Sequence, residues 1–188
     1  MKPQLTKQHI SYRMHTTNTT LTVLCAWFDM WLVFAGEGSR KHHLPPMNRF
    51  PNFFRYTGEA HLRAMILSVY SLYDPGPGRV TLPALLKELK LDAATATRAQ
   101  KFVRKGAEIA ARLKPLRHYL IAHRSDKHTF QDAYYEAGLT PNRISRLVTL
   151  SCAAFNCMAR GSGQPEFFRV NFAGDDMVEM LNELRLDQ

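Results

Sequence analysis

The residues best suited to chemistry lie in one short segment, from Arg117 to His123. Histidine is the side chain whose ordinary pKa lies near neutral pH, so His123 is a candidate acceptor for the proton of a ribose 2′-hydroxyl. The planar guanidinium of arginine matches a phosphate, so Arg117 is a candidate for stabilising the charge that builds on the phosphoryl oxygens. The pair therefore indicates cleavage of RNA, with no metal ion or other cofactor required.

The run around this pair reads Arg117-His118-Tyr119-Leu120-Ile121-Ala122-His123-Arg124. It resembles the signature of the HEPN superfamily, which is an arginine, a polar residue, several variable residues and a histidine. The abortive-infection subgroup of that superfamily is similar over roughly residues 10 to 160. In that subgroup, as in this sequence, a long first helix is followed by a helix that ends like Leu72-Tyr73-Asp74. A short leucine-rich helix comes next, and then the signature.

The resemblance implies an all-α, HEPN-like helical bundle with long antiparallel helices, which dimerises with its signature helices facing each other. It also implies a metal-independent endoribonuclease, of the kind found among toxins and phage-defence effectors, with an antitoxin or immunity protein as a further partner. His118 stands at the polar position after the arginine, where the resemblance gives it an orienting role beside the catalytic Arg117 and His123.

Helix geometry explains why a second copy is expected. Residues six apart on one helix are offset by about 120° and roughly 9 Å, so Arg117 and His123 of one chain do not converge on a single phosphate. A homodimer could complete the site. Basic residues on and before the signature are expected to hold further RNA phosphates: Arg124, Lys114, Arg112 and Lys105.

Two other interpretations remain open at this point. Leu116 and His123 share a helix face, so His123 could be a hydrogen-bonded core residue and Arg117 a surface ion-pair partner, as in a non-catalytic HEPN-like module that binds RNA or protein.

Residues Phe130 to Val148 also fit the apolar and glycine positions of a DNA-binding helix-turn-helix regulator. Tyr134 fits this pattern poorly, because it stands where a small residue normally lets the two helices approach.

The elements that must position these residues follow from apolar periodicity and from capping and stop signals. We expect helices from about 10 to 35, 52 to 73, 93 to 113, 129 to 137, 142 to 160 and 175 to 186, and a short helix beginning at Pro83 after a Thr81 cap. The helix from about 93 to 113 places Phe102, Ile109 and Leu113 on one side, which is expected to face the core. Beside that face lies a basic stripe of Arg98, Lys101, Lys105 and Arg112. A basic loop is expected at 36–52 and a C-terminal extension at 161–188.

Composition agrees with one soluble domain spanning the 188 residues. The formal charge of +9 attracts polyanions such as RNA. Three cysteines leave an odd thiol and suit a reducing cytoplasm. The apolar run from Leu21 to Phe34 is shorter than the roughly 20 residues that cross a bilayer and contains Asp29, so we expect a buried helix and no membrane partner.

Overall fold

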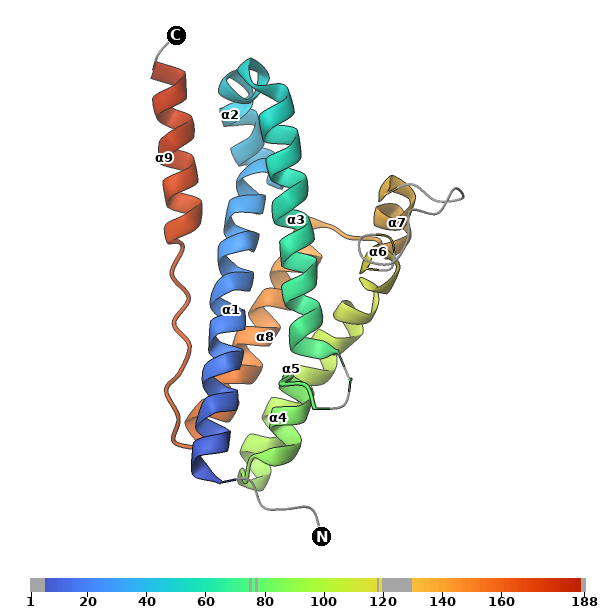
Figure 1. The fold of residues 1–188 in the computed structure, drawn as a ribbon, viewed down its shortest axis with the longest axis vertical. Helices are drawn as coiled ribbons and strands as arrows, with labels where there is room; N and C mark the ends of the chain where they lie inside the picture. Colours follow the sequence, from blue (N-terminus) through green and yellow to red (C-terminus); the bar gives the residue numbers. More distant parts are fainter. Residues whose placement is uncertain (1–5, 75, 77, 118, 120–129, 187–188) are drawn as a thin grey trace.

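The computed structural model describes residues 6–74, 76, 78–117, 119 and 130–186. Over these residues the regular structure is helical and contains no strand, which confirms the expected all-α bundle. Its body consists of four long helices, α1 (Lys7–Ala35), α3 (Pro51–Tyr73), α5 (Ala93–Ala111) and α8 (Pro141–Gly161). Figure 1 shows that α1 and α3 run antiparallel to each other, as do α5 and α8.

Five shorter helices complete the described part of the chain. They are α2 (Glu37–Arg49), α4 (Leu82–Glu88), α6 (Lys114–Arg117), α7 (Phe130–Ala137) and α9 (Phe172–Leu186). Helix α2 joins α1 to α3 at one end of the bundle, whereas α6 and α7 project from its side (Figure 1).

Local signals set most helix starts. Thr6, Thr81, Asp92 and Thr140 cap α1, α4, α5 and α8, because each side chain accepts a hydrogen bond from the backbone N–H three residues further on. Such caps satisfy one of the N–H groups that a helix start leaves without a partner. The predicted cap of the short helix at Thr81 is therefore confirmed, and α4 begins one residue before Pro83.

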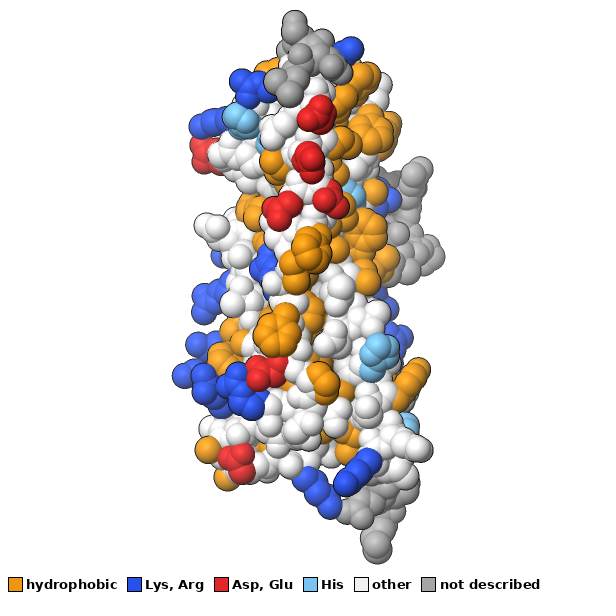
Figure 2. Space-filling view, turned by 90° about the vertical axis from the view of Figure 1, so that its left-hand side faces the viewer, with side chains coloured by type: hydrophobic (Ala, Val, Ile, Leu, Met, Phe, Trp, Pro, Cys, Tyr) orange, Lys and Arg blue, Asp and Glu red, His pale blue; other side chains and the backbone are white. Residues whose placement is uncertain are grey.

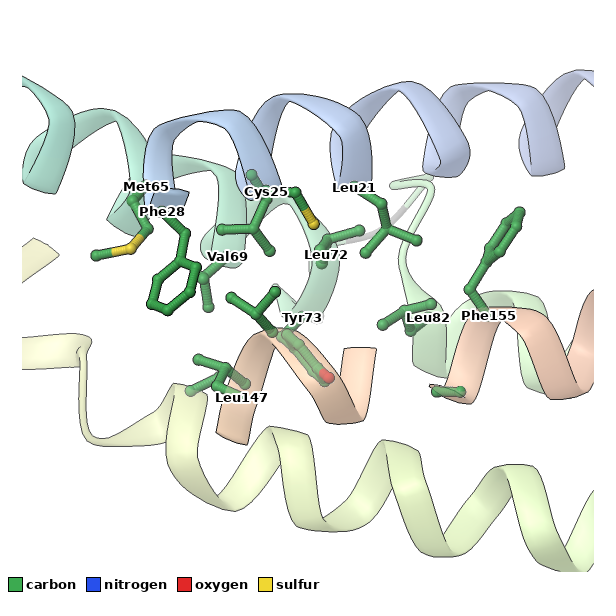
Figure 3. Packing of buried hydrophobic residues seen from close by; sticks show 14 of the residues in the cluster. Leu21, Cys25, Phe28, Met65, Val69, Leu72, Tyr73, Leu82, Leu147 and Phe155 are labelled. Atoms are coloured by element: carbon green, nitrogen blue, oxygen red, sulfur yellow. The ribbon is translucent and has the colours of Figure 1, made fainter. Parts of the chain in front are cut away.

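The core lies where α1, α3, α4 and α8 meet, and Figure 3 shows its apolar side chains pointing into the space between these helices. Burial of each large aliphatic side chain stabilises the fold by roughly 1.5–3 kcal/mol. The fully buried members include Leu21, Leu24, Phe28, Met65, Ile66, Val69, Leu72, Leu82, Leu147 and Phe155.

Helix α1 is the one helix in the described part of the chain that is long and apolar enough to cross a membrane by length and composition. Its buried side chains contact α3, α8 and α9, as expected of a core helix. The prediction of a buried helix over 21–34 is confirmed.

The inner face of α5 differs from the predicted one. Leu113 is buried, but Phe102 and Ile109 are only half-buried. The buried stripe consists of the small residues Ala99, Val103, Gly106 and Ala110. Small side chains are needed here because α8 and the Tyr73 ring approach α5 closely. A Cβ atom at Gly106 would lie 2.1 Å from the hydroxyl oxygen of Tyr73.

The basic loop expected at 36–52 is wrong, because residues 37–49 form helix α2. Pro45 and Pro46 lie inside this helix, where each removes a backbone hydrogen-bond donor. Packing offsets that loss, since Pro46 and His43 are buried and Met47 packs against an apolar cluster with Phe54 and Leu181. Burial also lowers the pKa of His43 below its ordinary value.

The C-terminal extension returns along α1. Residues 164–171 form a non-helical segment, after which α9 packs against α1 and α2 (Figure 1). Arg169 of this segment forms an ion pair with Asp29, whose carboxylate is buried on α1. A buried carboxylate without a cation is costly, so this pair holds the extension in one position along α1.

Candidate functional site

Arg117 is positioned by the short helix α6. The chain leaves α5 at Ala111 and restarts at Lys114, with Pro115 in the first turn where its missing N–H costs little. Leu116 is completely buried and fixes α6 to the core, and the backbone N–H of Arg117 donates to the carbonyl of Leu113 at 2.9 Å. Residue 117 therefore has a defined backbone position.

The side chain of Arg117 lies against the end of α3. Its guanidinium carbon is 4.1 Å from the centre of the Tyr70 ring, which is a cation–π contact. Its Nη2 atom is 3.9 Å from Oδ2 of Asp74, longer than a hydrogen bond, so the carboxylate attracts the guanidinium without binding it directly. The side chain remains 32% exposed, which leaves the cation accessible to a ligand.

Asp74 is itself held by two other groups. Its carboxylate forms an ion pair with Arg79 and accepts a hydrogen bond from the backbone N–H of Gly76 at 3.3 Å. Because Tyr70 and Asp74 are four residues apart at the end of α3, both face Arg117. The ring and the carboxylate together restrict where the guanidinium lies.

The structure places only part of the predicted site. His118, His123 and Arg124 lie outside the described residues, so their roles remain predictions. Lys114 and Arg112 are exposed near Arg117, and Lys105 is half-buried two turns before the end of α5. None of these three forms an ion pair with another described residue, which leaves their charges available to an anion.

The acidic side chains of α9 form a separate group on the surface. Figure 2 shows them in a column over α9, while the largest group of lysine and arginine side chains lies at one edge of the view and others are scattered over this face. The exposed acids of α9 are Asp175, Asp176, Glu179 and Glu183. Helix α9 packs on α1 and α2, so its acids do not cover the basic stripe of α5.

A hollow of about 570 Å³ lies between α5 and α8, but away from Arg117. It is lined by Arg98 near the start of α5, about 20 Å along the helix from Arg112. Arg160, on the opposite wall formed by α8, forms an ion pair with Glu166 at 2.7 Å. The candidate site at Arg117 and this hollow are therefore separate features.

The turn expected between the helices at 129–137 and 142–160 is present between α7 and α8. Gly138 has a φ of 57°, in the left-handed region that favours glycine, and Thr140 caps α8. The guanidinium of Arg143, which lies within the segment that resembles a helix-turn-helix, donates to the carbonyl of Gly138 and closes the turn. DNA binding by Phe130 to Val148 stays a prediction.

Among the described residues, no group of three or more histidine, cysteine or acidic side chains could hold a metal ion. The residues beside Arg117 that the sequence did not reveal are Tyr70 and Asp74. Their four-residue spacing at a helix end was the available signal, but it did not show that Arg117 would lie beside them.

Comparison with known protein families matches residues 12–161 to the family model HEPN_AbiU2, described as AbiU2. The match begins in α1 and ends at the last residue of α8, so the C-terminal extension lies outside it. No curated protein and no solved structure matches the chain.

Proposed function

The chain belongs to the AbiU2 family of HEPN-type abortive-infection proteins, and on that premise we propose that it is a metal-independent endoribonuclease. The observation that carries the proposal is the placement of Arg117, an accessible cation held against Tyr70 and Asp74 at the start of the signature. A phosphate could replace the weak, long contact with Asp74 at small cost, because partly exposed ion pairs contribute little free energy.

In the proposed reaction, His123 takes the proton of a ribose 2′-hydroxyl, whose oxygen attacks the neighbouring phosphorus. The bond to the 5′-oxygen breaks, and that oxygen leaves with a proton supplied by water. Arg117 stabilises the charge on the phosphoryl oxygens, and His118 orients the site. The products carry a 2′,3′-cyclic phosphate and a 5′-hydroxyl.

Lys105, Arg112, Lys114 and Arg124 would contact flanking phosphates, which gives binding with little sequence preference. We place the activity in the cytoplasm, as a phage-defence or toxin activity that an antitoxin or immunity partner restrains. The direct test is incubation of the purified protein with a broad panel of RNAs in EDTA, followed by analysis of the new ends. Cyclic phosphate ends support the proposal.

Arg117 and His123 are expected to act from two chains of a homodimer whose interface includes residues 116–124. Light scattering should give twice the 21.5 kDa of one chain. A mixed dimer of Arg117→Ala and His123→Ala chains contains one intact composite site, so co-expressed variants should recover about one quarter of the parental activity. A strict monomer at tens of micromolar, or mixed variants with no recovery, contradicts the composite site.

Tyr70 is expected to act as a positioning residue for Arg117. Tyr70→Leu removes the ring under the guanidinium and should lower the cleavage rate about three- to tenfold, the scale of one cation–π contact. Tyr70→Phe keeps the ring and should cleave at nearly the parental rate. Equal rates for the two variants, with melting curves showing both folded, would mean that the ring does not position Arg117.

The ion pair between Arg117 and Asp74 also favours a second function, a HEPN-like module that binds RNA or protein without cleaving it. In that case Arg117 is a structural partner of Asp74, whose carboxylate attracts it from 3.9 Å. RNA binding with no cleavage across the panel would select this second function.

A further inference from the structure

Two of the three cysteines meet in the folded chain. Cys25 on α1 and Cys152 on α8 are 127 residues apart in sequence, yet their Sγ atoms are 3.9 Å apart. Cys157, also on α8, is directed elsewhere and donates to the carbonyl of Thr95 at 3.6 Å. The fold thus selects one pair of thiols and leaves the third apart.

The two paired thiols are chemically different. The hydrogen bond from Cys25 lowers the pKa of Cys152, and the positive charge of Arg169 acts in the same direction. The same hydrogen bond and burial raise the pKa of Cys25. Cys25 is 2% exposed, whereas Cys152 is only half-buried. Cys152 is therefore the more exposed residue of the pair, and the charge of Arg169 favours its thiolate.

We propose that Cys25 and Cys152 form an oxidative modification site, at which a hydroperoxide produces a reversible disulfide between α1 and α8. The sulfur of Cys152 attacks one oxygen of the hydroperoxide, the O–O bond breaks, and water or an alcohol leaves with the thiol proton. Cys152 is then a sulfenic acid. The sulfur of Cys25 attacks it, the S–O bond breaks, and water leaves with the proton of Cys25.

The bundle geometry permits this step with a small movement. A disulfide requires the two sulfur atoms to approach to about 2.05 Å, which rotation of the two side chains and a slight shift of α1 towards α8 would provide. The new bond would close a very long loop of the chain, which restricts the unfolded state strongly. Oxidation should therefore raise the melting temperature by roughly 5–15 °C.

The test uses the full chain. Purified protein is treated with hydrogen peroxide, remaining thiols are alkylated, and the digest is analysed by mass spectrometry. The expected products are a cross-linked peptide pair containing Cys25 and Cys152 and an alkylated Cys157. The melting temperature should rise and should return to its starting value with dithiothreitol.

Variants separate the pair from the third cysteine. Cys157→Ser should keep the reversible rise in melting temperature, whereas Cys152→Ser should lose it. Peptide mapping of the parent protein does not depend on any variant folding. Three alkylated cysteines after peroxide treatment, a disulfide that includes Cys157, or a cross-link between chains would each overturn the proposal.

Discussion

Alanine at Arg117 or at His123 is expected to lower the rate of RNA cleavage by about two orders of magnitude or more. In the proposed reaction, loss of His123 removes the group that accepts the 2′-hydroxyl proton. Loss of Arg117 removes the cation proposed to stabilise the negative charge of the transition state. Both rates should be measured in EDTA, because the proposed reaction uses no metal ion.

Matched control variants distinguish the loss of a catalytic group from the loss of an arginine or a histidine elsewhere on the surface. Arg55→Ala on α3 removes an exposed arginine, and His15→Ala on α1 removes an exposed histidine, both from outside the proposed site. Both should cleave at the parental rate. Circular dichroism and melting curves must show that Arg117→Ala and His123→Ala are folded. If these two folded variants cleave as fast as the controls, the nuclease proposal is wrong.

Gly106→Ala is expected to lower the free energy of unfolding by about 1–3 kcal/mol. The added Cβ would lie 2.1 Å from the hydroxyl oxygen of Tyr73 and 2.8 Å from the ring carbon that bears it. Tyr73 is buried and hydrogen-bonds with Ser151 at 2.9 Å, so it has little room to move. The overlap outweighs the gain of roughly 1 kcal/mol that alanine brings to a helix interior.

Gly38→Ala is the matched control for this prediction. Gly38 also lies in a helix, but a Cβ atom there would have no neighbour within 4 Å. The control variant should be unchanged or slightly more stable in urea unfolding. Tyr73→Phe removes the closest oxygen, so combining it with Gly106→Ala should cost less than the sum of the two single changes. Additive effects would show that the Tyr73 hydroxyl is not what excludes alanine.

Much of the helical order could be predicted because its signals are local. Thr81 and Thr140 mark helix starts through bonds to residues three positions away, and Gly138 marks a stop through its own φ. Apolar periodicity located the long helices for the same reason, since the period depends only on helix geometry. These features need no knowledge of what packs against them.

The sequence-based predictions are wrong where contacts with distant segments determine the local structure. Pro45 and Pro46 predict a loop locally, but packing near Phe54 and Leu181 keeps α2 helical. On α5 the large residues Phe102 and Ile109 were expected inside, whereas the close approach of α8 admits only a narrow stripe of small ones. Neither neighbour is visible in the local pattern.

The candidate site divides in the same way. Arg117 was predicted from the types and spacing of residues in its own segment. Tyr70 and Asp74, which hold it, come from the end of another helix and were not predicted as part of the site. A sequence motif identifies the candidate reacting groups. The residues that orient those groups depend on which helix ends pack together in the fold.

The buried ion pair of Asp29 and Arg169 has a consequence for the order in which the bundle is completed during synthesis. Arg169 is made 140 residues after Asp29 and follows the last residue of α8. Until it leaves the ribosome, the Asp29 carboxylate has no cation, and hydration by water opposes its burial. The nascent α1 should therefore keep this part of its surface hydrated and dock last among the described helices, although it is translated before the others.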